Sequence, residues 1–499
     1  MAKILLVYPP SKTQLHQNCP LGIQLLAAVL EKNGHEPILL DASAVQNNMN
    51  VEQIVQYADH LQPDIIGMTL LTPMIMEAYR LAKQLKSMNF RLLAGGPHAT
   101  LRPEEVVNNG FDAAVIGEGE NTINEAVKAL LGQIPKNQVA GWAYQEPDGT
   151  VVFTKPRDFI EDLDTVELPA RHLVDSLHYG NNGKNTLHTN LFSSRGCPAK
   201  CTFCSGHLFG KKYRFRTAQS ILDEIEHIYL TYGTCRFHFV DDAMTLHRKR
   251  LVEFCEGLNE RHLPIEWSVM TRIDTVNEAF LSMIRQAGCM AIDYGIESGH
   301  PETLTRIRKP HTVEMVKKVI PMTARSGIRP NTFFIFGFPW EDVAALQNSY
   351  NLIQELAQYV SVFHPAVASI IIPFPDTVIY QQYAKQYGFE NWWLSEEKNY
   401  DNLVPSGTSY YESKIFRLGN ILKADFFKYD QEIKNKIVEI FEFMHFHNLE
   451  KRNSLVSKVQ RNLITLSKRI NEISPMAEKV VFRPIKIAEA NLAASFISS

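Results

Sequence analysis

Short apolar stretches alternate with stretches of helical periodicity over most of this 499-residue chain. In the first third, the apolar stretches cover residues 4–8, 37–41, 64–71, 90–95 and 113–117, with helical periodicity between them at 22–32, 51–61, 75–88 and 104–108. Regular alternation of this kind is typical of a doubly wound, Rossmann-like parallel sheet. The sequence therefore predicts an α/β domain over residues 1–140, with its ligand site beyond the carboxyl ends of the strands.

The alternation breaks between residues 141 and 185, where turn residues predict a short hairpin and a linker. Six further strands are then predicted at residues 187–194, 237–240, 266–270, 291–296, 332–338 and 366–372, with helical stretches between them. Six strand–helix units favour a partial or full parallel barrel over residues 186–395, whose active site would lie at the carboxyl ends of its strands.

The last hundred residues differ in character. Aromatic residues come first, at Trp392, Trp393, Tyr400, Tyr410 and Tyr411, and helical patterns follow at 432–448 and 454–473. This pattern predicts a helical C-terminal domain over residues 396–499.

The composition gives no sign of a charged macromolecular partner. The chain is 45% hydrophobic and 21% charged, with a formal net charge of −3. This balance provides no attraction to nucleic acid or to an anionic membrane, which favours a small-molecule partner. No window approaches the roughly 20 apolar residues of a membrane span, and the first residues lack the features of a signal peptide. Seven cysteines, an odd number, argue against a disulfide framework and predict a cytoplasmic protein.

Glycines gather where two predicted strands of the first domain end. Gly95-Gly96-Pro97-His98 follows the fourth strand, and Gly117-Glu118-Gly119-Glu120 follows the fifth. Glycine at such turns lets the backbone approach a bulky ligand closely, although ordinary turn glycines are the alternative. Neither run is a G-x-G-x-x-G fingerprint, so a plain dinucleotide site is not supported.

Three cysteines follow the first predicted barrel strand. Cys197, Cys201 and Cys204 have the spacing C-x3-C-x2-C. Thiolates are the usual ligands of four-iron four-sulfur clusters, and three of them leave one iron open to a small molecule. The alternative is a structural zinc site with His207 as the fourth ligand. Closed zinc sites normally combine two paired groups of ligands that lie far apart in sequence, and no second group is seen here.

The cysteine spacing, with Phe203 before the last cysteine, resembles the signature of the radical S-adenosylmethionine (SAM) superfamily. The resemblance implies that the open iron chelates the amino and carboxylate groups of SAM, and that electron transfer cleaves SAM into methionine and a 5′-deoxyadenosyl radical. It also implies a SAM site at the following positions: Phe203, Asp242, Arg272, Glu297, Ser298, Phe336 and Gly337.

The implied roles differ among these positions. Asp242 and Glu297 would hold charged or hydroxyl parts of SAM, and the backbone at residues 336–337 would line the adenine. Arg272 would pair with a carboxylate, since its planar fork binds carboxylates bidentately. The alternative for each residue is a helix cap or a surface ion pair, and Asp242 in particular could cap the next helix.

The glycine turns, together with the runs at residues 5–10 and 20–22, resemble the cobalamin-binding domain that is fused to many radical SAM enzymes. The resemblance implies these cobalamin-binding residues: Thr69, Gly95, Gly96, Pro97, His98, Gly117, Glu118 and Gly119. The loop over residues 9–20 contains His16 but no D-x-H-x-x-G motif, so we expect no protein histidine on the lower face of cobalamin. His98 is as suited to a hydrogen bond as to a metal.

The resemblance covers roughly residues 1–395 and implies an enzyme with three cofactors: a four-iron four-sulfur cluster, SAM and cobalamin. The most common reaction of such enzymes is methylation of an unactivated carbon, here of a small molecule, with flavodoxin or ferredoxin as electron donor. The alternatives are a cyclase or oxidase without methyl transfer and a cobalamin-binding sensor. A helical tail covers the barrel mouth in many such proteins, and a core-packing role is the alternative. No residue need act as a general base.

Overall fold

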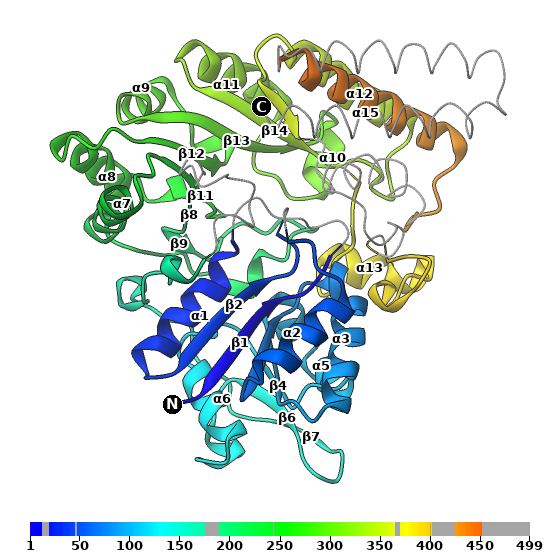
Figure 1. Cartoon of the computed structure of the whole chain (residues 1–499). Helices are drawn as coiled ribbons and strands as arrows, with labels where there is room; N and C mark the ends of the chain where they lie inside the picture. The colour runs from blue at the N-terminus through cyan, green and yellow to red at the C-terminus, as the bar shows by residue number, and fades with distance from the viewer. Residues whose placement is uncertain are drawn as a thin grey trace, which may run out of the picture.

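The computed structural model describes residues 1–11, 19–44, 47–174, 189–242, 244–364, 370–399, 401 and 425–451. It contains two large sheets, one in each half of the chain, and the strands of both are mostly parallel (Figure 1). The first sheet, in blue, lies below the second, in green, and helices surround both. The expected fold class, a doubly wound sheet followed by a parallel barrel, is confirmed.

The first sheet has the strand order β2-β1-β3-β4-β5-β6-β7. Its strands are β1 Lys3–Tyr8, β2 Glu36–Asp41, β3 Ile65–Thr69, β4 Leu92–Gly95, β5 Ala113–Val115, β6 Trp142–Gln145 and β7 Val151–Phe153. β1 to β5 run parallel, and β6 and β7 join antiparallel to them. Central β1 is buried apart from Lys3, as expected of a parallel strand covered by helices on both faces.

The helices of this domain are α1 Leu21–Lys32, α2 Val51–Leu61, α3 Ile75–Ser87, α4 Gly96–Leu101, α5 Pro103–Asn108 and α6 Ile123–Leu130. The sequence predicts α1, α2, α3 and α5 but places a turn where α4 lies and gives no helix at α6. Pro97 stands in the first turn of α4, where a missing N–H costs no hydrogen bond.

The predicted hairpin exists but is part of the first sheet. β6 pairs with β5 and β7 pairs with β6. The first sheet therefore extends beyond residue 140, where the sequence places the end of the first domain.

The second sheet is an open barrel of parallel strands in the order β8-β11-β12-β13-β14-β15. They are β8 Thr189–Leu191, β11 Arg236–Phe239, β12 Glu266–Thr271, β13 Cys289–Glu297, β14 Arg329–Phe334 and β15 Val362–His364. A separate ribbon pairs β9 Ser194–Arg195 with β10 Arg214–Phe215. The sixth barrel strand begins earlier than the predicted 366–372, part of which lies outside the described residues.

The larger helices of this half are α7 Ala218–Tyr232, α8 Arg248–Glu260, α9 Glu278–Gln286, α10 Pro301–Arg306, α11 Val313–Arg325, α12 Val343–Leu356, α13 Val378–Tyr387 and α15 Gln431–Lys451. The 3-10 helices within the described residues are η1 Thr72–Met74, η2 Lys136–Gln138, η3 Leu163–Thr165, η4 Arg171–Leu173, η6 Gly206–Phe209, η7 Met244–Leu246, η8 Ile273–Thr275 and η9 Trp392–Leu394. No helix in the described part of the chain is long and apolar enough to cross a membrane.

Helix α15 closes the outer edge of the second sheet. It lies along α12 and β15 (Figure 1). The Asn448 side chain accepts a hydrogen bond from the N–H of Phe363 at 2.9 Å and donates one to its carbonyl at 2.5 Å. An edge strand otherwise leaves such groups unpaired. The described part of the C-terminal region thus packs on the sheet edge, as in the core-packing alternative, and the predicted helix at 454–473 lies outside the described residues.

Asn448→Ala should lower the free energy of unfolding by about 1–3 kcal/mol, because both backbone groups of Phe363 lose their partner. Asn435→Ala, on the exposed face of the same helix, is the control, since it makes the same change in helix propensity. Urea unfolding followed by circular dichroism measures the difference. Equal stability of the two variants would contradict the edge-closing role of Asn448.

Candidate active site

A cavity of 310 Å³ lies between the carboxyl edge of the first sheet and the barrel. Its volume is in the range of ligand pockets, roughly 300–1,000 Å³. The wall from the first domain includes these positions that the sequence predicts for cobalamin: Thr69, Gly95, Gly96, Pro97, Glu118 and Gly119. The barrel contributes Phe192, Ser194, Arg195 and Asp242, among others. Both halves of the chain therefore border one space.

At two glycines, the first-domain wall of this cavity consists of backbone without side chains. A Cβ atom on Gly22 or on Gly95 would meet no other atom within 4 Å. Gly96 has a different constraint, because its φ is +88° and a Cβ atom there would lie 2.7 Å from Thr69 Oγ1. Bare backbone can approach a flat ring system closely, so this wall fits a corrin.

His98, which the sequence predicts as a cobalamin-binding residue, is buried and does not line the cavity. Its side chain is fully buried, with Nδ1 3.1 Å from Thr72 Oγ1 and Nε2 3.2 Å from Glu105 Oε1. Burial lowers the pKa of His98. A neutral imidazole has one donor and one acceptor nitrogen, and both are engaged, so no lone pair is left for cobalt. His16 lies outside the described residues.

The loop after β5 also differs from the prediction. Gly117 does not line the cavity, and its N–H donates to Thr100 Oγ1 at 3.0 Å. Glu118 lines the cavity, but its carboxylate accepts hydrogen bonds from Arg195 and Arg214, each at 2.9 Å. The Glu118 side chain thus connects the first domain to the barrel rather than standing free for a ligand.

The cysteine loop lies close to this cavity. The N–H of Gly206 donates to Cys204 Sγ at 3.2 Å. A Cβ atom on Gly206 would lie 3.2 Å from that sulfur, 3.9 Å from Asp242 Oδ2 and 4.0 Å from Cys197 Cβ. Burial raises the pKa of the Cys204 thiol to about 11. Burial also raises the pKa of Cys201, which the positive charge of Lys309 opposes.

The loop fits a cluster better than a single ion. Within the described residues, no three His, Cys, Asp or Glu side chains converge as ligands of one metal ion would. A four-iron cluster does not require its ligands to converge on one point, because each thiolate binds a separate iron. Three thiols on one loop can bind a cluster in this way.

A buried ion pair adjoins the cysteine loop at the end of β13. Glu297 Oε1 lies 2.8 Å from Lys309 Nζ, and the side chains are 9% and 13% exposed. Glu297 has a φ of +68°, and the register of β13 with β14 shifts at this point. A Cβ atom on Gly295 would lie 2.6 Å from the Glu297 carboxylate, so a larger residue there would displace this carboxylate from its present position. Strained backbone of this kind is concentrated at functional sites.

Lys309 is absent from the residues predicted from the sequence. Its ammonium lies 5.8 Å from the centre of the Phe203 ring, and its charge acts on Cys201. Lys309 follows α10 in a loop that carries no periodic signal, so only the folded chain brings it to Cys201, Phe203 and Glu297.

Arg272 lies at the end of β12, beside the cysteine loop, but its guanidinium is already hydrogen-bonded to a carboxylate of this chain. Its Nε and Nη2 donate to Asp274 at 2.9 and 2.6 Å. The hydrogen bonds that Arg272 donates to Asp274 raise the pKa of Arg272, and the charges of Cys197 and Cys201 add to the rise. The expected pairing with a ligand carboxylate would have to compete with Asp274.

The two aspartates after β11 have separate tasks. Asp242 faces the cavity near Cys204, and burial together with Asp241 raises its pKa. It does not cap α8, since the His247 side chain accepts the capping bond from the N–H of Arg250. Asp241 is buried and accepts hydrogen bonds from the backbone and hydroxyl of Ser193, at 2.9 to 3.0 Å.

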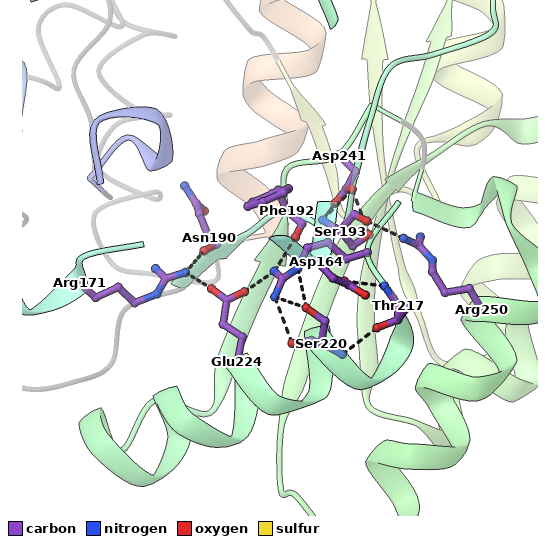
Figure 2. A network of polar contacts seen from close by, with 11 residues as sticks. Asp164, Arg171, Asn190, Phe192, Ser193, Thr217, Ser220, Glu224, Asp241 and Arg250 are labelled. Carbon is purple, nitrogen blue, oxygen red and sulfur yellow. Dashed lines mark hydrogen bonds and ion pairs between the residues drawn. The ribbon is translucent and has the colours of Figure 1, made fainter. Parts of the chain in front are cut away.

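A polar network holds the strand that leads into the cysteine loop. Figure 2 shows Asp241 and Arg250 meeting at Ser193 from the barrel side. It also shows Glu224 of α7 beside Arg171, whose guanidinium donates to the carbonyl of Asn190 at 2.9 Å. Residues 190–194 are therefore fixed from both sides.

Three predicted SAM residues, Ser298, Phe336 and Gly337, are buried. Ser298 is fully buried, with its hydroxyl 3.2 Å from Ser349 Oγ of α12. Phe336 is fully buried as well. Gly337 is covered by Tyr429, whose hydroxyl donates to its carbonyl at 2.5 Å. The Ser298 hydroxyl and the Gly337 carbonyl are thus engaged within the chain, and the SAM contacts expected of Ser298 and of the backbone at residues 336–337 stay predictions.

Glu341 holds the loop that contains Gly337. Its carboxylate accepts hydrogen bonds from the N–H groups of Gly337 and Phe338 at 2.9 and 3.2 Å and from Thr303 Oγ1 at 3.1 Å. Burial raises the pKa of Glu341 to about 7 despite these bonds.

A row of polar side chains crosses the concave face of the barrel. His238 Nδ1 lies 2.8 Å from Ser268 Oγ, Asn331 donates to Asp293 at 2.7 Å, and His364 lies 3.4 Å from Asp293. These residues come from β11, β12, β13, β14 and β15 in turn. On the other face of the sheet the alternate residues are apolar and pack on helices, as Phe239 does on Phe254 of α8.

Comparisons with known proteins follow the same division of the chain. The model of the B12 binding domain matches residues 15–127, and that of the Radical SAM superfamily matches residues 191–353. An uncharacterised methyltransferase of Pyrococcus horikoshii is 30% identical over 389 residues, which cover 76% of this chain and 82% of the relative. The anaerobic magnesium-protoporphyrin IX monomethyl ester cyclase of Rubrivivax gelatinosus is 30% identical over 374 residues, covering 73% and 66%.

Two solved structures share the fold. One is the radical S-adenosylmethionine methyltransferase TsrM from Kitasatospora setae with tryptophan and a SAM analogue bound, with a TM-score of 0.65 at 19% identity over 78% of this chain and 77% of that chain. The other is the apo form of OxsB, a cobalamin-dependent S-adenosylmethionine radical enzyme, with a TM-score of 0.67 at 15% identity over 99% and 81%. At these identities the likeness concerns the fold.

Glu341→Gln should change how stability depends on pH. The pKa of Glu341 is higher in the folded chain than in the unfolded chain, so the folded chain binds the proton more tightly. Proton binding at Glu341 therefore adds to the free energy of unfolding. The addition is complete below about pH 4.5 and is lost as the pH rises through 7. The loss is on the order of 3 kcal/mol. Melting temperatures of wild type and Glu341→Gln between pH 5 and 8 test this. Parallel curves would contradict the assignment, and the exposed Glu439→Gln is the control.

Proposed function

The chain belongs to the family of radical SAM enzymes that carry a B12-binding domain, and from this premise we propose that it is a cobalamin-dependent methyltransferase acting on an unactivated carbon of a small molecule. The observation that carries the proposal is a shared space: Asp242 lines the cavity beside Gly95 and also adjoins Gly206 and Cys204. A ligand bound against Gly22 and Gly95 and a ligand bound at the cysteine loop would be in contact near Asp242. Methyl transfer between two ligands requires such contact.

The residues divide into three groups of binding roles. Cys197, Cys201 and Cys204 would hold the four-iron cluster. Phe203, Asp242, Glu297 and Lys309 would surround SAM. Thr69, Gly95, Gly96, Pro97 and Gly119 would line the cobalamin site.

When bound, the cluster supplies the electron that cleaves SAM, and cobalamin carries a methyl group from SAM to the substrate. The chain's own residues bind and orient. Lys309 and Glu297 offer one positive and one negative group to the charged ends of the amino acid part of SAM, and Phe203 offers an apolar face. Within the described residues no histidine lines the cavity, and a cobalamin lower face without a protein ligand remains part of the proposal.

The concave face of the barrel supports a substrate that forms hydrogen bonds. The polar row from His238 to His364 lies on the inner face of the strands whose ends carry Arg272 and Glu297. On the same face Val240 and Met270 are 46% and 37% exposed, so the space above the row is not filled. We place the substrate in this space, with a hydroxyl or amino group on the row. A flavodoxin or ferredoxin as electron donor and a cytoplasmic location complete the proposal.

A second candidate is an oxidative cyclase with the same cofactors and no methyl transfer. The cyclase of Rubrivivax gelatinosus, at 30% identity, is the observation that favours it. The chain spans 66% of that cyclase and 82% of the methyltransferase from Pyrococcus horikoshii, which favours the methyltransferase.

Lys309→Met and Glu297→Gln should each raise the dissociation constant of SAM about tenfold or more, because a charge-assisted hydrogen bond contributes about 1.5–3 kcal/mol. Both variants should keep the cluster, since neither removes a thiolate. Titration of the reconstituted proteins with SAM measures the constants, and iron and sulfide analysis measures the cluster. The control is Lys317→Met, which removes the exposed Lys317–Glu355 pair. Unchanged SAM affinity in both variants would place SAM elsewhere.

The proposed function is tested without the natural substrate. Anaerobic protein with the cluster, SAM and cobalamin should form 5′-deoxyadenosine under titanium(III) citrate, and S-adenosylhomocysteine with methylcobalamin from cob(I)alamin. Cys201→Ala should abolish 5′-deoxyadenosine, because it removes one of three cluster ligands. Formation of 5′-deoxyadenosine without any methylcobalamin would favour the cyclase, and absence of both products would leave a cobalamin-binding sensor.

A further inference from the structure

Two arginines stand opposite each other in the ribbon that precedes the cysteine loop. Arg195 of β9 and Arg214 of β10 are cross-strand partners. Two positive charges in this position repel each other and destabilise a ribbon unless they are neutralised. The neutralising groups come from the other domain of the chain.

Glu118 and Glu120 supply the opposite charges. Glu118 accepts a hydrogen bond from each arginine at 2.9 Å, and Glu120 pairs with Arg195. All four side chains are at most 10% exposed. Because a buried charge that loses its partner is strongly destabilising, this group holds together as a unit.

The loop that carries these glutamates is packed against other parts of the first half of the chain. The Glu118 carboxylate also accepts from the N–H of Ile160 at 2.7 Å. A Cβ atom on Gly119 would lie 3.1 Å from Leu26 of α1, so the loop packs directly on that helix. Glu118, Gly119 and Glu120 all line the cavity.

The connection from Arg195 to the cluster ligands is equally short. Only Gly196 separates Arg195 from Cys197, and its φ is +81°. A Cβ atom on Gly196 would collide with the carbonyl oxygens of Lys212 and Gly210. The guanidinium of Arg195 also lies 5.0 Å from the centre of the Phe192 ring. A shift of the Arg195 backbone is therefore passed on to Cys197 through a single, tightly packed residue.

We propose that Glu118 and Glu120, through Arg195, are positioning residues that fix the cobalamin-binding cavity relative to the cysteine loop. Nothing in the methyltransferase proposal assigns them this role, although the inference rests on that proposed function. Their task is to set the distance between cobalt and the methyl group of SAM, to which transfer is sensitive at the level of 1 Å.

Two reactions of SAM depend differently on this distance. In methyl transfer the electron pair of cobalt(I) attacks the methyl carbon, the sulfur–methyl bond breaks, and its electron pair stays on S-adenosylhomocysteine while cobalt becomes methylcobalt(III). In reductive cleavage one electron, supplied by titanium(III) citrate through the cluster, breaks the sulfur–C5′ bond and gives methionine and the 5′-deoxyadenosyl radical. The first reaction spans both domains, and the second needs the barrel alone.

The test compares Arg195→Lys and Glu120→Gln with wild type. Lysine keeps the positive charge of Arg195 but lacks the planar guanidinium that contacts the carboxylates of Glu118 and Glu120 at once. Both variants should keep the cluster and bind hydroxocobalamin, while the ratio of S-adenosylhomocysteine to 5′-deoxyadenosine should fall at least about tenfold. The control Lys212→Gln removes an exposed ion pair with Glu161 that adjoins the same ribbon, and it should leave the ratio unchanged.

A second measurement does not depend on turnover. Pulsed electron paramagnetic resonance between cob(II)alamin and the reduced cluster should show one narrow distance in wild type and a broader or shifted one in Arg195→Lys. An unchanged ratio and an unchanged distance would overturn the positioning role, as would equal loss of both products together with loss of cluster or cobalamin. A wild type that never forms methylcobalamin would instead overturn the proposed function, and the positioning role with it.

Discussion

The carboxyl edges of two parallel sheets border one cavity, and the rest of the structure depends on this constraint. Ligands of parallel α/β sheets bind beyond the carboxyl ends of their strands, so each sheet brings its own site to the shared space. Two groups of contacts maintain the arrangement. On one side Glu118 joins Arg195 and Arg214, and on the other Arg102 pairs with Asp376 through two bonds of 3.0 Å. A cofactor bound on either edge is therefore held close to the other.

The backbone at Glu297, beside the cysteine loop, adopts a conformation that residues other than glycine rarely adopt. Glu297 adopts a φ of +68°, which costs on the order of 1–3 kcal/mol for a residue other than glycine. The bulge turns its carboxylate back over Gly295 towards Lys309. An ordinary strand end would be more stable, so the strain indicates that the position of this carboxylate matters for function.

The sequence predicts the elements well because periodicity is a local property. The predicted strand 4–8 is β1, and the predicted helix 51–61 is α2. The cysteine spacing is local too. Partners of polar side chains are not local: His98 meets Glu105, Glu118 meets Arg195, and Lys309 reaches Glu297 only after folding. A motif therefore locates the site but leaves undecided which of its polar residues remain free for a ligand.

The concave face of the barrel extends this reasoning to the substrate. The interior of a parallel barrel is normally filled by branched apolar side chains. Here Asp293 stands in a polar row, and burial alone would raise its pKa, but the hydrogen bonds of His364 and Asn331 and the charges of His364 and His238 together outweigh burial and lower it. An ionised carboxylate at this depth is costly unless it is satisfied. Since Val240 and Met270 beside the row remain partly exposed, packing alone does not account for it, and the proposed substrate with hydrogen-bonding groups would.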